Sequence, residues 1–263
     1  MNEPLNDLER AYAKSLRGPE GQPELFRQLR TSTVWFLIPY HPELEGTLEL
    51  KSGDRMTFKV WEGKEGQFVP IFTSRERAQR ALRTVGGQAK QCCVAEMKGE
   101  WLFRALTSHP YGAALNPACG CGVTYLDRNA VRKIGDGSIL EPFEPGPRAH
   151  GKVQIVEPAD YPTSFIQPVF RFLRERPEVR AAWLFRQEPS TLAKTYYVFG
   201  LLVTGDAEAV KKDLAVVAHA ECPPETGFGV TALNAKDPAV ADIMAKFPPF
   251  YAAPDFVVRS RPV

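Results

Sequence analysis

The sequence predicts an α/β (α+β) protein of two domains: an N-terminal domain with a mixed α/β sheet and a C-terminal domain of the ferredoxin-like, split βαβ type. Segments with strand periodicity alternate with amphipathic helical segments through most of the 263 residues, as in α/β architectures. The stretch Gly135–Gly151 has neither periodicity and contains three prolines, which remove backbone donors and favour extended geometry. We therefore expect domains at residues 1–135 and 152–263, joined by a linker at 136–151.

The N-terminal domain is expected to begin with two helices and a buried strand. Apolar residues recur at helical spacing between residues 5 and 16, and again between residues 25 and 29 after a break rich in Gly and Pro. The continuous apolar run Thr33–Pro39 predicts a central strand that is buried on both faces. A hairpin of Met56–Glu62 and Gln67–Phe72 should follow, because a glycine-containing turn separates these two β-rich runs.

The rest of this domain is expected to alternate between helix and strand. Thr73 or Ser74 is a suitable N-cap for a helix that runs to about Thr84. The expected elements after it are a strand at Gln91–Met97, a helix at Gly99–Leu106, a turn-rich segment at His109–Gly122, a strand at Val123–Leu126 and a helix that Asp127 caps and that ends at Gly135.

The C-terminal domain has a simpler pattern. Its expected elements are strands at Val153–Val156, Val179–Gln187, Thr195–Thr204 and Thr226–Leu233, and helices at Ser164–Arg176, Ala207–Ala220 and Pro238–Phe247. The order β-α-β-β-α-β with a final helix is the basis for predicting the ferredoxin-like arrangement.

Bulk composition excludes several classes of partner. The net charge is +2, so no global field favours nucleic acid or an anionic membrane. No apolar run approaches the roughly 18 residues of a membrane helix, and the acidic, polar N-terminus does not read as a secretory signal. The five cysteines form no disulfide framework, which is typical of a protein of the reducing cytoplasm.

Two thiols are the main candidates for chemistry. Cys119 and Cys121 are separated by one glycine, with His109 upstream. Zinc sites usually combine two ligand pairs with two to four intervening residues, and that second pair is missing here. Small residues in a turn are the default interpretation, and no metal or cofactor is expected; a bound metal or a reactive thiol is the alternative.

Two groups of arginines suggest solvated surfaces. They are Arg75, Arg77, Arg80 and Arg83 in one predicted helix, and Arg171, Arg174, Arg176 and Arg180 in and after another. Neither group has the aromatic stacking residues or motif of a nucleic-acid reader beside it. We interpret both as outward-facing charge.

The segment from Phe247 to Phe256 is a candidate contact surface. It contains several prolines and aromatic residues, among them Pro249, Phe250 and Tyr251. Exposed apolar surface of this kind marks an interface, provided that the side chains are not buried.

An ordered set of short segments resembles the SseB-like, enhanced-serine-sensitivity family of bacterial proteins. The segments are Asn6–Glu9, Glu24–Leu29, Ser32–Trp35, Trp61–Glu62, Val69–Ser74, Val156–Pro158, Tyr161–Pro162, Val179, Ala181–Leu184 and Pro249–Tyr251. The resemblance implies an N-terminal and a C-terminal family domain on either side of the linker. It implies no reaction, cofactor or catalytic residue.

We therefore expect a non-enzymatic cytoplasmic protein that binds a protein partner or modulates a partner enzyme. One alternative is a sulfur- or metal-handling protein that uses Cys119 and Cys121. The other is a small-ligand sensor for an amino acid, with its site at the domain junction, where pockets often form.

Overall fold

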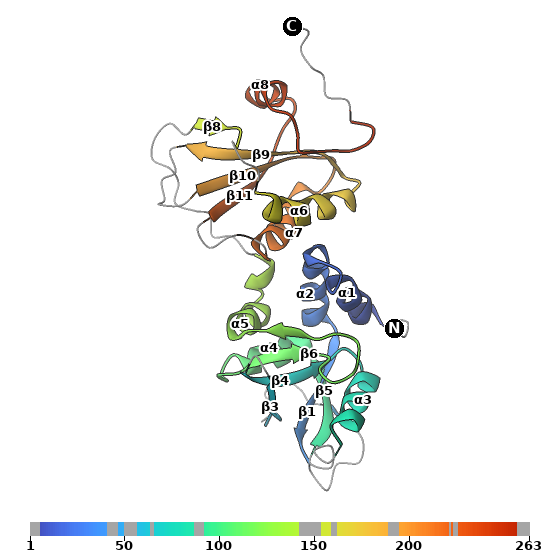
Figure 1. Cartoon of the computed structure of the whole chain (residues 1–263). Coiled ribbons are helices and arrows are strands. Elements are labelled where there is room, and N and C mark those ends of the chain that lie inside the picture. The colour runs from blue at the N-terminus through green and yellow to red at the C-terminus, as the bar shows by residue number, and fades with distance from the viewer. Residues whose placement is uncertain are drawn as a thin grey trace. The chain divides into compact units, whose positions relative to one another are not determined.

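The computed structural model describes residues 6–40, 47–49, 57–63, 66–86, 92–141, 154–158, 162–188, 195–220, 222 and 226–256. The chain divides into two compact units, Met1–Leu140 and Glu141–Val263 (Figure 1). The predicted linker begins inside the first unit, because helix α5 (Arg128–Asp136) and the 3₁₀ helix η3 (Ser138–Leu140) occupy its first residues. Its remainder from residue 142 lies outside the described residues.

The N-terminal unit contains a mixed sheet, as predicted. Its strands are β1 (Thr33–Pro39), β2 (Thr47–Glu49), β3 (Trp61–Gly63), β4 (Gly66–Phe72), β5 (Cys92–Lys98), β6 (Gly112–Leu115) and β7 (Thr124–Leu126). They are ordered β2-β5-β1-β4-β6-β7, with β3 paired to β4. The pairs β2–β5 and β4–β6 are parallel and the others are antiparallel.

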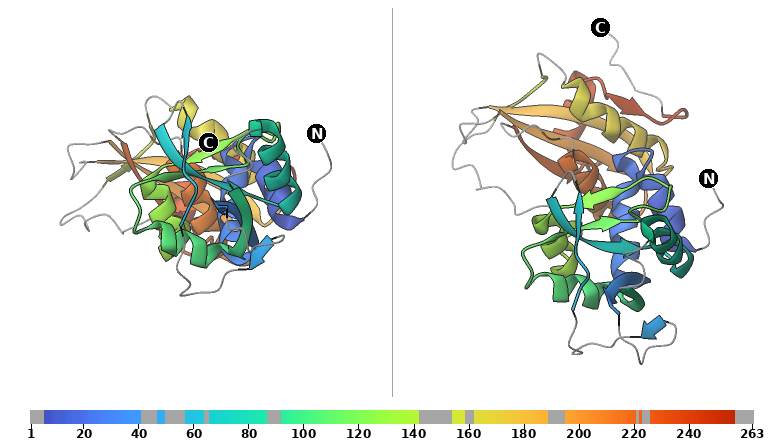
Figure 2. Two further views of the ribbon diagram at one scale, coloured as in Figure 1. Left: turned by 90° about the horizontal axis from the view of Figure 1, so that it is seen from below. Right: turned by 60° about the horizontal axis from the view of Figure 1, so that its bottom comes forward.

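Helices lie on both sides of this sheet. They are α1 (Asp7–Ser15), the 3₁₀ helix η1 (Pro19–Gly21), α2 (Gln22–Thr31), α3 (Arg75–Val85), α4 (Gly99–Leu106) and α5. Both views of Figure 2 place α3 on one side of the sheet and α4 with α5 on the other. Successive side chains of β1 point to opposite faces of the sheet, and both faces are apolar. Leu37, which is paired with Val94 of β5, packs toward α3. The neighbouring Phe36 points to the other face and is fully buried.

Two features of the N-terminal unit differ from the prediction. Strand structure in the first arm of the hairpin is confined to β3, and residues 57–60 are not in a strand; Met56 lies outside the described residues. The turn-rich segment contains a strand, β6, which the alanine-rich sequence Gly-Ala-Ala-Leu did not indicate. Its parallel pairing with β4 and its burial stabilise β6, because β-propensity depends strongly on tertiary context.

The C-terminal unit has the predicted order of elements, followed by one short strand that was not predicted. The elements are β8 (Gln154–Val156), α6 (Thr163–Arg174), β9 (Val179–Glu188), β10 (Thr195–Val203), α7 (Ala207–Ala220), β11 (Thr226–Ala232), α8 (Pro238–Lys246) and β12 (Tyr251–Ala252). The sheet order is β11-β10-β9-β12, with β8 also paired to β9.

This strand order is not that of a split βαβ domain. In a split unit another strand lies between the two parallel strands, but β10 and β11 are direct, parallel neighbours. The helix α7 therefore connects adjacent strands, and β8 is antiparallel to β9. The α/β class is confirmed, and the ferredoxin-like topology is wrong, because the order of elements does not determine which strands become neighbours.

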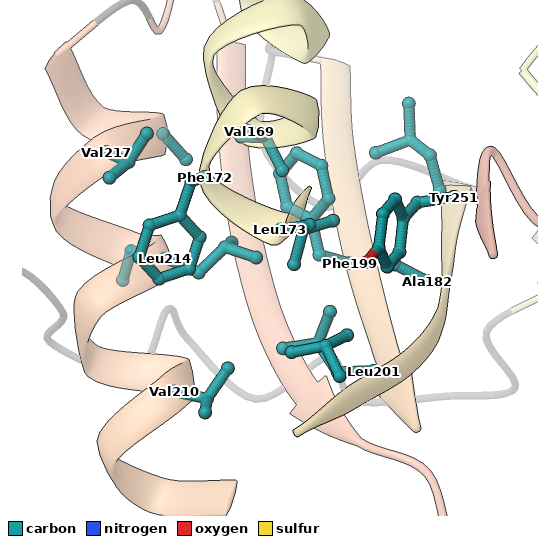
Figure 3. Packing of buried hydrophobic residues seen from close by; sticks show 14 of the residues in the cluster. Val169, Phe172, Leu173, Ala182, Phe199, Leu201, Val210, Leu214, Val217 and Tyr251 are labelled. Atoms are coloured by element: carbon teal, nitrogen blue, oxygen red, sulfur yellow. The ribbon is translucent and has the colours of Figure 1, made fainter. Parts of the chain in front are cut away.

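Both faces of the C-terminal sheet are covered. Helices α6 and α7 pack on one face, where Phe172, Leu214 and Phe199 belong to one apolar cluster (Figure 3). A second cluster on the other face combines Trp183 of β9 with apolar side chains of α8, and Trp183 Nε1 donates a hydrogen bond to the carbonyl of Phe247 at 2.9 Å. Among the described residues, no helix is both long and apolar enough to cross a membrane.

Candidate functional site

The loop between β6 and β7 has an unusual backbone. Asn116 (φ 53°), Ala118 (φ 58°), Gly120 (φ 74°) and Gly122 (φ 91°) all adopt left-handed conformations. Glycine adopts them without a steric cost, and asparagine tolerates them better than most residues do. These left-handed residues allow the chain to turn tightly around Cys119 and Cys121.

The two thiols are in contact. The Sγ atoms of Cys119 and Cys121 are 2.9 Å apart, and Cys119 Sγ also lies 2.9 Å from the carbonyl oxygen of Asn116. Cys119 is buried and Cys121 is half-buried. Cys119 has one S–H proton for two acceptors, and a thiolate at Cys121 attracts that proton more strongly than a neutral sulfur does.

Buried polar side chains anchor the start of the loop. Asn116 is fully buried, and its Oδ1 accepts a hydrogen bond from the backbone N–H of Thr73 at 3.0 Å. Its Nδ2 donates to Thr73 Oγ1 at 3.0 Å. The left-handed Asn116 is therefore held by the segment that connects β4 to α3.

Tyr12 of α1 connects the two ends of the loop. Its hydroxyl group lies 3.3 Å from the carbonyl oxygen of Leu115 and 3.1 Å from that of Gly122. Burial raises the pKa of Tyr12, so the hydroxyl keeps its proton and remains a donor. One side chain thus bridges the residues that flank the thiol pair.

A buried ion pair lies beside the hydrogen-bonded side chains of Asn116 and Thr73. Glu9 is 2% exposed and its Oε1 is 2.9 Å from Arg77 Nε; Thr73 Oγ1 lies 3.3 Å from the same oxygen. The prediction that Arg77 faces solvent is wrong, because its counterion comes from α1, 68 positions earlier in the chain. Arg75, Arg80 and Arg83 are exposed, as predicted.

The second arginine group also contains an ion pair. Arg176 pairs with Asp213, which is 3% exposed, and its guanidinium lies 4.8 Å from the centre of the Phe172 ring. Arg180 lies 2.9 Å from Asp255. These two side chains were predicted as part of a solvated face, and they instead tie α7 and the segment after β12 to the region around β9.

The surroundings shift the pKa values of the two thiols in opposite directions. The hydrogen bond with Cys119 and the Arg77 guanidinium lower the pKa of Cys121 to about 7, against burial and the Glu9 carboxylate, which raise it. The same hydrogen bond, burial and the charge of Cys121 raise the pKa of Cys119. The thiolate therefore forms at the accessible sulfur, which is the arrangement of a reactive cysteine.

His109 has another environment. Its ring packs edge-on against Phe58, with 5.1 Å between centroids. Among the described residues, no group of three or more His, Cys, Asp or Glu side chains could hold a metal ion. His109 therefore gives no support to a metal site with Cys119 and Cys121.

The predicted contact segment near the C-terminus is largely part of the core. Strand β12 pairs with β9. The side chain of Tyr251 is 7% exposed and belongs to the apolar cluster shown in Figure 3. Phe250 packs against the same cluster, and Pro249 is half-buried. The condition that these side chains be exposed is not met, because a two-residue strand that the sequence did not indicate brings them to the sheet.

Exposed apolar residues instead flank the thiol loop. Val123 and Tyr125 are 38% and 46% exposed, and Leu16 at the end of α1 is 40% exposed. A Cβ at Gly122 would lie 3.0 Å from Leu16 Cδ1, so Leu16 lies next to the loop. The sequence showed the Cys-Gly-Cys turn but not these neighbours or the anchoring residues Tyr12 and Asn116, whose partners are distant in sequence.

Comparison with known families matches both units. The family description "SseB protein N-terminal domain" matches residues 8–133, and "SseB protein C-terminal domain" matches residues 147–252. No curated protein and no solved structure matches the chain. Because both family domains are found in order and cover most of the sequence, the chain belongs to the SseB protein family.

Proposed function

We propose that this is a non-enzymatic protein of the bacterial cytoplasm that acts by binding a protein partner. The contact surface in this proposal consists of Leu16, Val123 and Tyr125, which we name the β7 surface. The observation that carries it is the exposure of three large apolar side chains around one loop of the N-terminal unit. Neither nucleic acid nor a membrane is part of the proposal.

The β7 surface has the character of a protein contact. Strand β7 lies at the end of the sheet order, and the Tyr125 ring is held edge-on against Phe68, with 5.6 Å between centroids. A tyrosine fixed in this way offers apolar area to a partner with little loss of side-chain entropy, and aromatic residues are enriched in interfaces.

The hydrogen bonds and the ion pair among the polar side chains near the loop support a structural role in preference to catalysis. The Glu9 carboxylate is paired with Arg77, and Asn116 and Thr73 bond to each other. These groups satisfy one another and hold the loop that carries Val123. None of the five cysteines, all of which the structure describes, is in a disulfide, which is compatible with a reducing compartment.

Copurification from the native host tests the proposal. The double variant Val123→Asp/Tyr125→Asp places charge on the β7 surface, and Tyr40→Asp is a matched control because Tyr40 is 57% exposed and lies outside that surface. We expect the wild type and the control to retain the same protein partner and the double variant to lose it, with circular dichroism spectra unchanged. Absence of any reproducible partner, or full retention by the double variant, would contradict the proposal.

A further inference from the structure

We propose that Cys119 and Cys121 form a redox-active pair that closes to an intrachain disulfide by exchange with a low-molecular-weight disulfide such as oxidised glutathione. This inference concerns the chemistry of the loop and does not depend on partner binding. It assigns a modification site to the Cys-Gly-Cys turn.

The geometry of the loop favours closure of a disulfide. The sulfur atoms are 2.9 Å apart as thiols, and a disulfide bond is about 2.0 Å long, so only a small approach is needed. Gly120 between them has φ 74°, a conformation that a residue with a Cβ adopts at a cost. Nothing lies within 4 Å of a Cβ placed at Gly120, so the left-handed backbone, and not crowding, is the local reason for glycine here.

The two sulfur atoms have unequal environments, which gives them different roles in the exchange. Cys121 is half-buried and can meet a small disulfide, whereas Cys119 is 2% exposed. The charged and titratable groups around Cys121 are Cys119, Arg77, Glu9 and the protonated Tyr12, and the first two favour its thiolate. Cys121 is therefore the attacking thiol and Cys119 the resolving thiol.

The exchange has two balanced steps. The Cys121 thiolate attacks one sulfur of oxidised glutathione, forms a mixed disulfide and releases one glutathione thiolate. Cys119 then loses its proton to that thiolate or to water and attacks Cys121 Sγ, which releases the second glutathione thiolate. The protein loses two electrons and two protons in total, and the small disulfide gains them as two thiols.

Thiol mapping of the full-length chain tests this sequence of steps. The reduced protein is incubated with oxidised glutathione, its remaining thiols are trapped with N-ethylmaleimide, and it is digested with trypsin. Cys119 and Cys121 are the only cysteines of peptide 105–128, whereas Cys222 lies in peptide 213–236 and Cys92 and Cys93 lie in peptide 91–98. The oxidation state of the cysteines in each of these three peptides can therefore be measured separately.

We expect neither cysteine of peptide 105–128 to react with N-ethylmaleimide, and we expect the mass of the peptide to be lower by two hydrogens. Cys119→Ser should stop at the mixed disulfide, with glutathione retained on Cys121, and Cys121→Ser should give little glutathionylation of Cys119. Cys222→Ser, the control, should leave the closure unchanged. Retention of both trapping sites in the wild type, or equal glutathionylation of the two single variants, would overturn the proposal.

Discussion

The reactivity of Cys121 should depend on pH far less steeply than that of an ordinary thiol. The thiolate is the nucleophile, and the hydrogen bond with Cys119 together with Arg77 lowers the pKa of Cys121 to about 7. A lowered pKa means that the thiolate is already present at neutral pH. Raising the pH above 7 therefore adds little further nucleophile.

The expected magnitude follows from the fraction ionised. A thiol with a pKa of about 7 rises from roughly half to nearly full ionisation between pH 7 and pH 9, a gain of about twofold; an unperturbed thiol of pKa about 8.5 gains about 25-fold over the same interval. Partial burial of Cys121 slows alkylation by a similar factor at both pH values, so it cancels from this ratio.

Iodoacetamide labelling provides the assay. The protein is labelled at pH 7 and at pH 9, and the initial rate at Cys121 is read from peptide 105–128 by fragmentation. Two variants form a matched pair: Cys119→Ser keeps a hydrogen-bond donor at position 119, and Cys119→Ala removes it. We expect the shallow profile in the wild type and a shift toward the steep profile in Cys119→Ala, with Cys119→Ser between them. A gain near 25-fold in the wild type, or identical profiles in all three proteins, would refute the reasoning.

Three further predictions concern stability. Arg77→Met leaves the Glu9 carboxylate without its guanidinium partner and should lower the free energy of unfolding by about 3 kcal/mol; urea denaturation should show that adding Glu9→Gln recovers part of this loss. Gly99→Ala should prevent normal packing of the N-terminal unit, because the new Cβ would lie 1.6 Å from the carbonyl oxygen of Leu29, and the amount of folded protein after expression measures this. Tyr251→Ala removes a buried ring from the C-terminal core and should cost about 3 kcal/mol in the same denaturation assay, while the alkylation profile of Cys121 stays unchanged.

Local signals in the sequence were sufficient for most of the elements. Ser74 and Asp127 accept hydrogen bonds from Arg77 N and Ala130 N, so both predicted caps are present. The apolar run of β1 and the bounds of α4 agree with the prediction. Side-chain periodicity and capping act over a few residues, and they can therefore be recognised without knowledge of the fold.

The features that the sequence did not indicate are formed by residues that are distant from one another in the chain. Strands β6 and β12 are short and have weak local signals, and both are stabilised by neighbours distant in the chain. The thiol pair was recognisable as a Cys-Gly-Cys turn. The hydrogen bonds of Tyr12 to the carbonyl groups that flank the pair, and the Glu9–Arg77 ion pair whose charges act on it, were not recognisable. No local pattern records a hydrogen bond or an ion pair across this distance in sequence.

The most direct test of the redox proposal is the thiol state of peptide 105–128 in the cells that produce the protein. Cells are quenched with acid before, during and after a pulse of the thiol oxidant diamide, and free thiols are trapped before digestion. We expect Cys119 and Cys121 to be reduced before the pulse, joined as a disulfide during it and reduced again after recovery, with Cys92 and Cys93 unchanged because both are buried. If both loop thiols stay reduced throughout a pulse that oxidises Cys222, the pair is not a redox site.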